Sequence, residues 1–423
     1  MNYERKRIYL CLAHMSDEGL EQKYIKEAFD TNWVVPLGPN VNAFEEDLKQ
    51  FIGQDKQGYV KEIVALSAGT AAIHLALIAC GVQTGDEVCV QSFTFCASSN
   101  PIKYLGAKPI LIDSEPYTWN MDPDLLEKSI IERKHLTGKY PKAIIPVALY
   151  GMPYDAARII AIAEKYGIPV IEDAAEGFGS KYAGQMLGTF GNYGVLSFNG
   201  NKMITTSGGG ALICKQPSDK EHIMWLATQA REGYPYYQHE AIGYNYRLSN
   251  ICAGIGRGQM TVAQEHIDHH KHIADLYRKA FAEIDGITFH DSPNDKYDSN
   301  FWLSTILIDP AVHVQGEDKA YHQQAQGAVG GAAGTVHQVK SLTTDCQPNN
   351  NVEAMRVFLD ERGIESRPLW KPMHRQPIYQ NDIAYTNGVS ESIFKKGLCL
   401  PSGPMVSDAD VDYIVENIKQ ALL

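Results

Sequence analysis

The sequence predicts an α/β protein with a mostly parallel sheet in a large domain, followed by a smaller α+β domain. From residue 60 to about residue 215, short apolar runs alternate with amphipathic stretches of helical length. A long helical stretch at about 250–285 then suits a linker between two domains. The remaining tail mixes strand-like runs with amphipathic helices. We therefore place the large domain at 1–260 and the small domain at 261–423. A chain of 423 residues is long enough to form two hydrophobic cores.

The first helical region lies at 17–52, where the pattern predicts a helix, a turn and a second helix over Val41–Ile52. Acidic residues at 45–47 favour that second helix, because they complement its dipole. Apolar runs that predict strands lie at 63–66, 87–91, 109–112, 143–149, 169–171, 195–198 and 211–214. Helical patterns between them lie at 71–80, 98–105 and 154–166. The ligand site of such a sheet is expected at the carboxyl ends of its strands.

In the small domain, the pattern predicts a strand over 302–308 and helices over 352–361 and 407–422. Ser407 and Asp408 suit the start of the last helix. A segment at about 322–345 departs in composition, since it is rich in Gln, Ala and Gly and has no apolar periodicity. We expect it to be a surface excursion that carries no chemistry.

Four histidines, His266, His269, His270 and His272, lie close together on the predicted linker helix. Neighbouring positions on a helix point in different directions. A solvated helix face is therefore favoured over a set of metal ligands, and no metal is expected.

The formal net charge of −12 disfavours nucleic acid and anionic membranes as partners. No run of eighteen apolar residues predicts a membrane span, and the first residues do not form a signal peptide. The eight cysteines are scattered without a C-x-x-C motif, which is typical of reduced thiols in a cytoplasmic protein.

Lys202 lies between two predicted core strands, after the turn Asn199-Gly200-Asn201 and before a glycine-rich run at 207–210. Glycines let backbone approach a ligand closely. A desolvated lysine can act as a nucleophilic amine, so one hypothesis is a Schiff-base lysine that holds an aldehyde cofactor. The alternative is a lysine at a strand end that reaches solvent past a tight turn.

Two further features end predicted strands and each allows two interpretations. The run Leu66-Ser67-Ala68-Gly69-Thr70 leads into an alanine-rich helix, whose free backbone N–H groups would make a phosphate seat. An ordinary N-cap at Thr70 is the alternative. In Ser92-Phe93-Thr94-Phe95, one phenylalanine could stack on an aromatic cofactor, although core packing is the commoner fate of such a side chain.

A carboxylate pair, Glu172-Asp173, closes another strand and is either surface decoration or a working acid. Asp173 could hold a protonated pyridine nitrogen, which keeps the ring electron-poor. Ser197 ends the strand before Lys202, and its hydroxyl would complete the phosphate seat. A phosphate seat, a stacking ring, an acid and an amine are together the parts that pyridoxal 5′-phosphate needs.

The motifs ALSAGTAAIHLAL, SFTFCAS, ALYG, IEDAAEGFGSKYAG, GTFGNYGVLSFNGNKMITTSGGGAL and GYNYRLSN resemble the DegT/StrS family of sugar-nucleotide aminotransferases. The resemblance implies fold type I, with a three-layer α/β/α large domain around a mixed, mostly parallel seven-stranded sheet. Within the family, SFNGNK, TQARE, WLST and RPLWKPMH are most similar to 4-aminotransferases of bacillosamine-type synthesis. One departure is Ala148, where many relatives carry histidine.

The resemblance implies a role for each matching residue. Lys202 matches the Schiff-base lysine and proton shuttle, and Asp173 matches the partner of the pyridine nitrogen. Glu176 matches the residue at the cofactor 3-hydroxyl, and Phe95 matches the stacking ring. The phosphate seat corresponds to Gly69, Thr70, Ala71 and Ser197, with Asn245 supplied by the neighbouring subunit of a homodimer. Residues expected around the sugar nucleotide or amino donor are Arg231, Arg247, Arg367 and His374.

The implied reaction moves an amino group from L-glutamate to the 4-keto carbon of a UDP-4-keto-6-deoxy-(N-acetyl)hexosamine. Pyridoxal 5′-phosphate is the expected cofactor, with pyridoxamine 5′-phosphate as its intermediate form. Alternatives are a 3-aminotransferase, an enzyme for dTDP- or GDP-linked keto-sugars, and a cofactor-binding regulator that is not an enzyme. A related deoxysugar dehydratase has histidine at the lysine position, so Lys202 argues against that activity.

Overall fold

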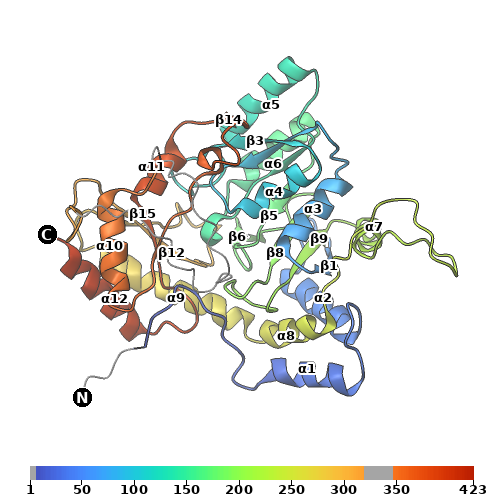
Figure 1. Cartoon of the computed structure of the whole chain (residues 1–423), viewed down its shortest axis with the longest axis horizontal. Coiled ribbons are helices and arrows are strands. Elements are labelled where there is room, and N and C mark those ends of the chain that lie inside the picture. The colour runs from blue at the N-terminus through green and yellow to red at the C-terminus, as the bar shows by residue number, and fades with distance from the viewer. Residues whose placement is uncertain (1–5, 319–345) are drawn as a thin grey trace.

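The computed structural model describes residues 6–318 and 346–423, and the predicted excursion at 322–345 lies outside these ranges. A large sheet-containing domain and a smaller domain lie side by side, and the long helix α9 (Ala263–Phe281) runs from the large domain into the small one (Figure 1). This is the α/β architecture with a second α+β domain that the sequence predicts.

One sheet forms the centre of the large domain. Its strand order is β1-β9-β8-β5 followed by β4-β2-β3-β14, and parallel bridges Ile144–Val170 and Val147–Asp173 join the two halves. The β1–β9 and β9–β8 pairs are antiparallel, whereas the other paired strands of the sheet are parallel. The strands are β1 (Glu62–Leu66), β2 (Glu87–Gln91), β3 (Lys108–Ile112), β4 (Ala143–Ile145), β5 (Ile171–Asp173), β8 (Tyr193–Ser197), β9 (Gly210–Cys214) and β14 (Ile383–Tyr385). The mixed, mostly parallel sheet confirms the predicted fold class, and β14 adds one strand to the seven expected.

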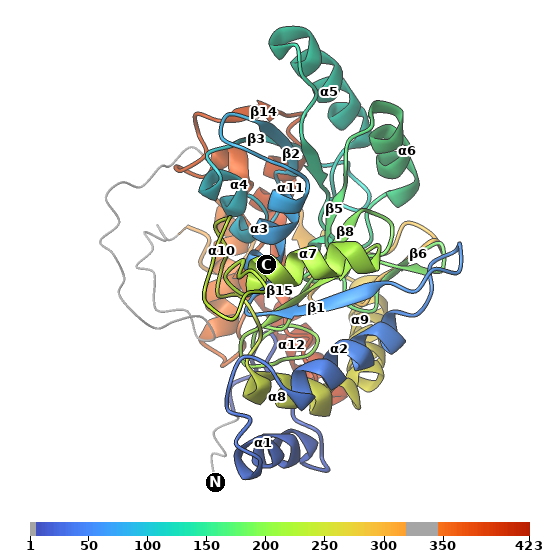
Figure 2. The same ribbon diagram turned by 90° about the vertical axis from the view of Figure 1, so that its right-hand side faces the viewer.

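Helices cover both faces of this sheet, because successive strand residues point to opposite sides. Ile63 of β1 packs in one core cluster and Val64 in another. The first cluster contains side chains of α2 (Pro39–Ile52), α5 (Pro123–Thr137) and α6 (Ala156–Tyr166). The second contains side chains of α3 (Gly69–Ala79), α4 (Asn100–Tyr104) and α7 (Pro217–Ala227). Figure 2 shows β1 between α7 and α2, which is the expected three-layer arrangement.

The small domain is built on an antiparallel sheet with the order β10-β12-β15-β13. Its strands are β10 (Ile287–Phe289), β12 (Ser304–Ile308), β13 (Arg367–Pro368) and β15 (Gly397–Leu400), and its helices are α10 (Asn350–Asp360), α11 (Val389–Lys396) and α12 (Asp408–Ala421). Ser407 caps α12 and forms a capping box with Asp410, as the Ser-Asp helix start predicts. A third, short sheet has the order β11 (Tyr297–Asp298), β6 (Lys181–Tyr182), β7 (Gln185–Met186).

Two segments cross the proposed domain boundary. Ile8 pairs with Ile364 and lies in the small-domain core, although it belongs to the first residues of the chain. Conversely, β14 pairs with β3 and extends the large sheet from the C-terminal part of the chain. Local periodicity does not reveal such exchanges, because the partner of a strand is set by backbone pairing far away in sequence.

The predicted linker is two helices rather than one. α8 (Asn250–Met260) and α9 are separated at Thr261–Val262, and α8 packs on α1 (Leu20–Asp30). Glycine is required at this contact, since a Cβ on Gly258 would lie 2.6 Å from Glu21 N.

The prediction that the four histidines of α9 lie on a solvated helix face is wrong for two of them. His266 and His270 are buried, and their Nδ1 atoms lie 3.2 Å from the carbonyl oxygens of Met203 and Phe301. His272 instead pairs with Asp408. His266 and His270 both lie on the buried face of α9 together with Ile267 and Tyr277, because they are four residues apart. Within residues 6–318 and 346–423, no three His, Cys, Asp or Glu side chains form a metal-binding group. In the same ranges no helix has the length and apolarity of a membrane span.

Candidate active site

A cavity of about 350 Å³ lies where β5, β8 and the start of α3 meet residues of the small domain. Gly69, Thr70, Asp173, Ser197 and Lys202 line it, although they are up to 133 residues apart in sequence (202 − 69). The cavity is therefore at the carboxyl ends of strands, where open α/β sheets bind ligands.

The start of α3 forms one side of the cavity. The N-cap is Ala68 in an extended conformation, and no side chain caps the helix. Thr70 is thus inside the first turn, and the alternative of an N-cap at Thr70 is wrong. A Cβ on Gly69 would lie 3.1 Å from Ser197 Cβ, and one on Gly210 would lie 2.4 Å from Gly69 N. Small residues therefore bring β8 and β9 against a helix start whose N–H groups suit an anion.

Asp173 closes β5 and is buried at the cavity. Its Oδ2 accepts a 2.6 Å hydrogen bond from Ser98 Oγ, and its Oδ1 accepts a 3.2 Å bond from the Ala175 N–H. Burial raises the pKa of Asp173, and the Ser98 hydrogen bond acts in the opposite direction. A cationic partner would stabilise this carboxylate further, because an opposite charge offsets the desolvation of a buried anion.

Lys202 follows a tight turn in which its N–H donates to the Asn199 carbonyl over 2.9 Å. Its Nζ lies 3.2 Å from Glu176 Oε1 and 4.1 Å from the centre of the Trp302 ring. Burial raises the pKa of Glu176 to about 7, while the Lys202 charge lowers it. The lysine therefore does not reach solvent past its turn, since its side chain is only 13% exposed.

Comparisons with known proteins agree with this geometry. Residues 16–332 and 318–419 match the DegT/DnrJ/EryC1/StrS aminotransferase family. The chain belongs to that family. EpsN of Bacillus subtilis (strain 168), whose name describes it as a proposed pyridoxal phosphate-dependent aminotransferase, is 43% identical over 97% of this chain and 95% of its own.

Two further relatives extend the comparison. GDP-perosamine synthase of Escherichia coli O157:H7 is 33% identical over 97% of this chain and 98% of its own. The pyridoxal-phosphate form of the proposed sugar aminotransferase Spr1654 from Streptococcus pneumoniae superposes with a TM-score of 0.80, at 25% identity and 98% coverage of both chains. This DegT/DnrJ/EryC1/StrS protein is therefore an aminotransferase, and pyridoxal 5′-phosphate is its cofactor.

The residues at the cavity of this aminotransferase fit that cofactor. The uncapped start of α3 and the Ser197 hydroxyl suit a phosphate, Asp173 suits a protonated ring nitrogen, and Lys202 suits an aldehyde. Ala71 belongs to the same first helical turn, but it is buried and its side chain does not line the cavity. The carboxylate of Glu176 is held by the Tyr150 N–H, which donates to its Oε2 over 2.7 Å.

The two phenylalanines after β2 have different surroundings. Phe93 is fully buried in the core, whereas Phe95 is 54% exposed and lines the cavity. Of the two rings, only that of Phe95 is therefore at the cavity, and its stacking role stays a prediction. Its ring packs against Trp370, with 5.4 Å between centroids.

The structure adds aromatic residues that sequence reasoning did not identify. Trp302 and Trp370, both from the small domain, line the cavity together with Asn199, Asn201 and Ser98. The indoles occur in the segments WLST and RPLWKPMH, which served only as family markers. No local pattern distinguishes these tryptophans from core residues, so only the contact between domains assigns them to the cavity.

The residues expected around the substrate do not line this cavity in the single chain. Arg247 is buried, and its Nη1 forms a 2.6 Å ion pair with Glu45 and donates to the Ala65 carbonyl. Its guanidinium is therefore paired within the large domain, and a substrate role for Arg247 stays a prediction.

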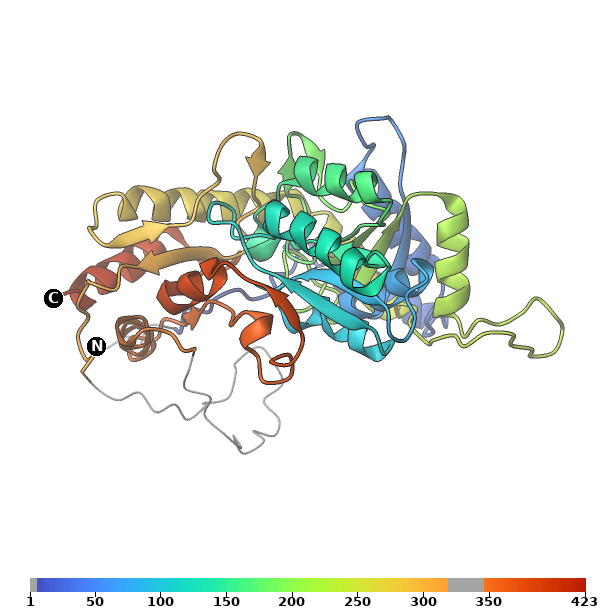
Figure 3. The same cartoon turned by 90° about the horizontal axis from the view of Figure 1, so that it is seen from above.

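Three further residues expected around the substrate, and Asn245, which is expected at the phosphate of a neighbouring subunit, also lie outside this cavity. Arg231 stacks on Tyr237 in a segment after α7 that extends away from the body (Figures 1 and 3). Asn245 lies on the return of that segment, bridged to Thr228. Arg367 pairs with Glu365 in the small domain, and His374 contacts Ser92 and Glu391. The roles of these four residues stay predictions.

Proposed function

We propose that this aminotransferase moves the amino group of L-glutamate to the 4-keto carbon of a UDP-4-keto-6-deoxy-(N-acetyl)hexosamine, as in bacillosamine-type synthesis. The products are 2-oxoglutarate and a 4-amino sugar nucleotide. The observation that carries the proposal is the position of Lys202 Nζ in the cavity, between Glu176 and Trp302. The choice of this sugar class is supported by the motifs SFNGNK, WLST and RPLWKPMH.

The cofactor-binding residues have distinct roles in this proposal. Gly69, Thr70 and Ala71 present backbone N–H groups to the phosphate, and Ser197 adds its hydroxyl. Asp173 keeps the ring nitrogen protonated, and Phe95 covers a ring face. When bound, pyridoxal 5′-phosphate supplies an electron sink for the carbanion that amino transfer generates.

Lys202 carries out the proton transfers of the reaction, and Glu176 positions its amine. Lys202 Nζ takes the proton from the α-carbon of glutamate, and it delivers a proton to the sugar carbon that receives nitrogen. Glu176 lies 3.2 Å from this amine and holds it by charge. The Tyr150 N–H and the buried surroundings fix the Glu176 carboxylate. The Lys202 amine is therefore held in one orientation within a site that contains little water.

The active unit in this proposal is a homodimer in the cytoplasm. Asn245 lies outside the cavity of its own chain, and we propose that it completes the phosphate seat of the neighbouring subunit. The net charge of −12 fits neither nucleic acid nor an anionic membrane as a partner.

A GDP-linked keto-sugar is the second candidate substrate. The relative that supports it is named GDP-perosamine synthase and covers nearly the whole chain. dTDP-linked sugars and 3-keto sugars are further alternatives within the same reaction class. A regulator without catalytic activity is disfavoured, because the cavity holds an intact lysine and two carboxylates.

A panel of nucleotide 4-keto and 3-keto sugars, each incubated with glutamate and the holoenzyme, tests the proposal. Mass spectrometry should find the amine product only with UDP-linked 4-keto sugar. A product with GDP-linked sugar alone would replace the substrate assignment, and 3-amino products would replace the regiochemistry. Borohydride reduction that tags a residue other than Lys202 would contradict the site itself.

A further inference from the structure

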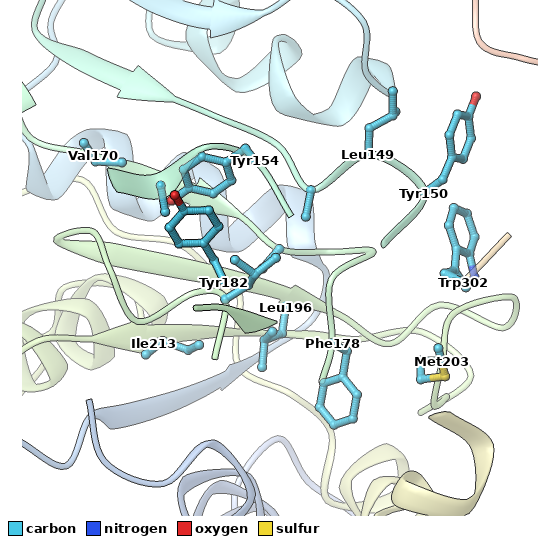
Figure 4. Close-up of a cluster of buried hydrophobic side chains, with 14 of the residues drawn as sticks. Leu149, Tyr150, Tyr154, Val170, Phe178, Tyr182, Leu196, Met203, Ile213 and Trp302 are labelled. Carbon is cyan, nitrogen blue, oxygen red and sulfur yellow. The ribbon is translucent and has the colours of Figure 1, made fainter. Parts of the chain in front are cut away.

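Trp302 makes two separate contacts to the turn that carries Lys202. Its Nε1 donates a 2.7 Å hydrogen bond to the Asn201 carbonyl, and its ring centre lies 4.1 Å from Lys202 Nζ. The indole is only 3% exposed, and it precedes β12 of the small domain. Figure 4 draws Trp302 at the end of the buried cluster that also holds Tyr150 and Met203. A residue of one domain thus contacts both the main chain and the charge of the reactive turn in the other.

Asn300 fixes Trp302 and Glu176 at the same time. Its Oδ1 accepts a 2.8 Å bond from the Trp302 N–H, and its Nδ2 donates to the Glu176 and Phe178 carbonyls over 2.8 and 2.9 Å. A Cβ on Gly151 would lie 1.8 Å from Asn300 Oδ1, so only glycine leaves room for this side chain. The buried Asn300 amide therefore connects the main chains of Trp302 and Glu176, whose side chains both contact Lys202 Nζ.

The protonated Lys202 side chain is attracted to both the Glu176 carboxylate and the Trp302 ring, and these two contacts favour one position of Nζ. A cation over tryptophan gains about 0.5–1 kcal/mol at exposed sites and about 2 kcal/mol when desolvated. The lysine stem is flexible, and without such a place it would sample several rotamers. In the proposed function, Lys202 alternates between a bonded and a free amine, so the free amine needs a defined position within reach of the reacting carbon.

We infer that Trp302 is a positioning residue for Lys202, which holds the free amine against Glu176 between bonding events. This inference rests on the proposed role of Lys202. Trp302 acts through the amine, because its ring lies over Lys202 Nζ and its Nε1 donates to the Asn201 carbonyl of the same turn.

The variants Trp302→Leu and Trp302→Phe test this inference, with Trp119→Leu as the matched control. Trp119 is also 3% exposed and stacks on His290 at 3.6 Å, but it is outside the cavity lining. Two quantities are measured after cofactor removal. The first is the rate at which added pyridoxal 5′-phosphate becomes bonded to Lys202, followed by absorbance and borohydride trapping. The second is the Kd of pyridoxamine 5′-phosphate, which forms no bond to lysine.

Trp302→Leu should slow bonding roughly 10- to 30-fold, because the amine loses its defined position and a misplaced group reacts more slowly, and it should change the Kd less than about threefold. Trp302→Phe keeps a ring face and should slow bonding less than Trp302→Leu. Trp119→Leu should lower thermal stability without changing the bonding rate.

Three results would overturn the inference. They are an unchanged bonding rate in both Trp302 variants, a Kd that weakens as much as the rate falls, and equal slowing in Trp119→Leu. If the wild-type protein itself is not trapped at Lys202, the proposed function fails instead, so the two failures are distinguishable.

Discussion

Ser98 Oγ donates a 2.6 Å hydrogen bond to Asp173 Oδ2 at the cavity. Burial raises the pKa of Asp173, and this hydrogen bond is the largest influence that lowers it. The hydroxyl therefore favours the charged carboxylate, which is the form needed to keep a ring nitrogen protonated.

Ser98→Ala should reduce the rate of amino transfer by about tenfold, since a hydrogen bond to a charged group contributes about 1.5–3 kcal/mol. Asp173→Asn should lose most activity, because a neutral amide does not hold the ring nitrogen protonated. Turnover with glutamate measures both variants. Ser99→Ala, at a neighbouring buried serine outside the cavity lining, is the control. Wild-type rates in Ser98→Ala would show that the hydroxyl has no part in catalysis.

Lys202→Ala should abolish turnover while leaving the binding of pyridoxamine 5′-phosphate and nucleotide sugar measurable. The phosphate seat is on other elements, so removal of the amine should leave it in place. Calorimetric titration and the loss of the yellow absorbance of the bound cofactor check this. Lys215→Ala, at an exposed lysine, should behave as wild type. Near-native turnover of Lys202→Ala would refute the assignment.

Glu176 should make stability depend on pH. Its pKa rises from 4.5 to about 7 on burial, so the folded protein binds more protons here than the unfolded chain between these values. This contribution to the free energy of unfolding is therefore lost as pH rises through that window. The decrease in unfolding free energy from about pH 5 to about pH 8 should be on the order of 2 to 3 kcal/mol larger in wild type than in Glu176→Gln. Urea unfolding across this range measures it, and identical slopes would contradict it.

Arg247→Met should destabilise the protein rather than weaken substrate binding. Glu45 would lose a 2.6 Å partner while staying buried, which costs about 3–5 kcal/mol when a buried pair is broken. Arg158→Ala breaks an exposed pair with Asp124 and should cost less than about 1 kcal/mol. Chemical denaturation and the KM for nucleotide sugar are the two measurements. A large rise in KM at unchanged stability would instead place Arg247 at the substrate site.

The sequence alone is sufficient for the strands of the large sheet other than β14, for β12, for most helices and for the set of reactive groups at the strand ends. Local patterns carry this information, since periodicity reflects which side of an element is buried. Thus β1, β9 and α12 lie within a few residues of their predicted bounds, and Asp173, Ser197 and Lys202 line one cavity. The choice between Phe93 and Phe95 was open, because both have the same residue type and only burial separates them.

What the sequence determined by itself is the order of the secondary structure and the set of reactive groups at the strand ends, because both depend on neighbours in the chain. The tertiary structure decided which distant groups meet them. It brought Trp302 and Trp370 to the lysine, paired Arg247 with Glu45, and moved Ile8 and β14 across the domain boundary. These contacts depend on packing and charge pairing between remote segments, and no local spacing encodes the partner of a side chain.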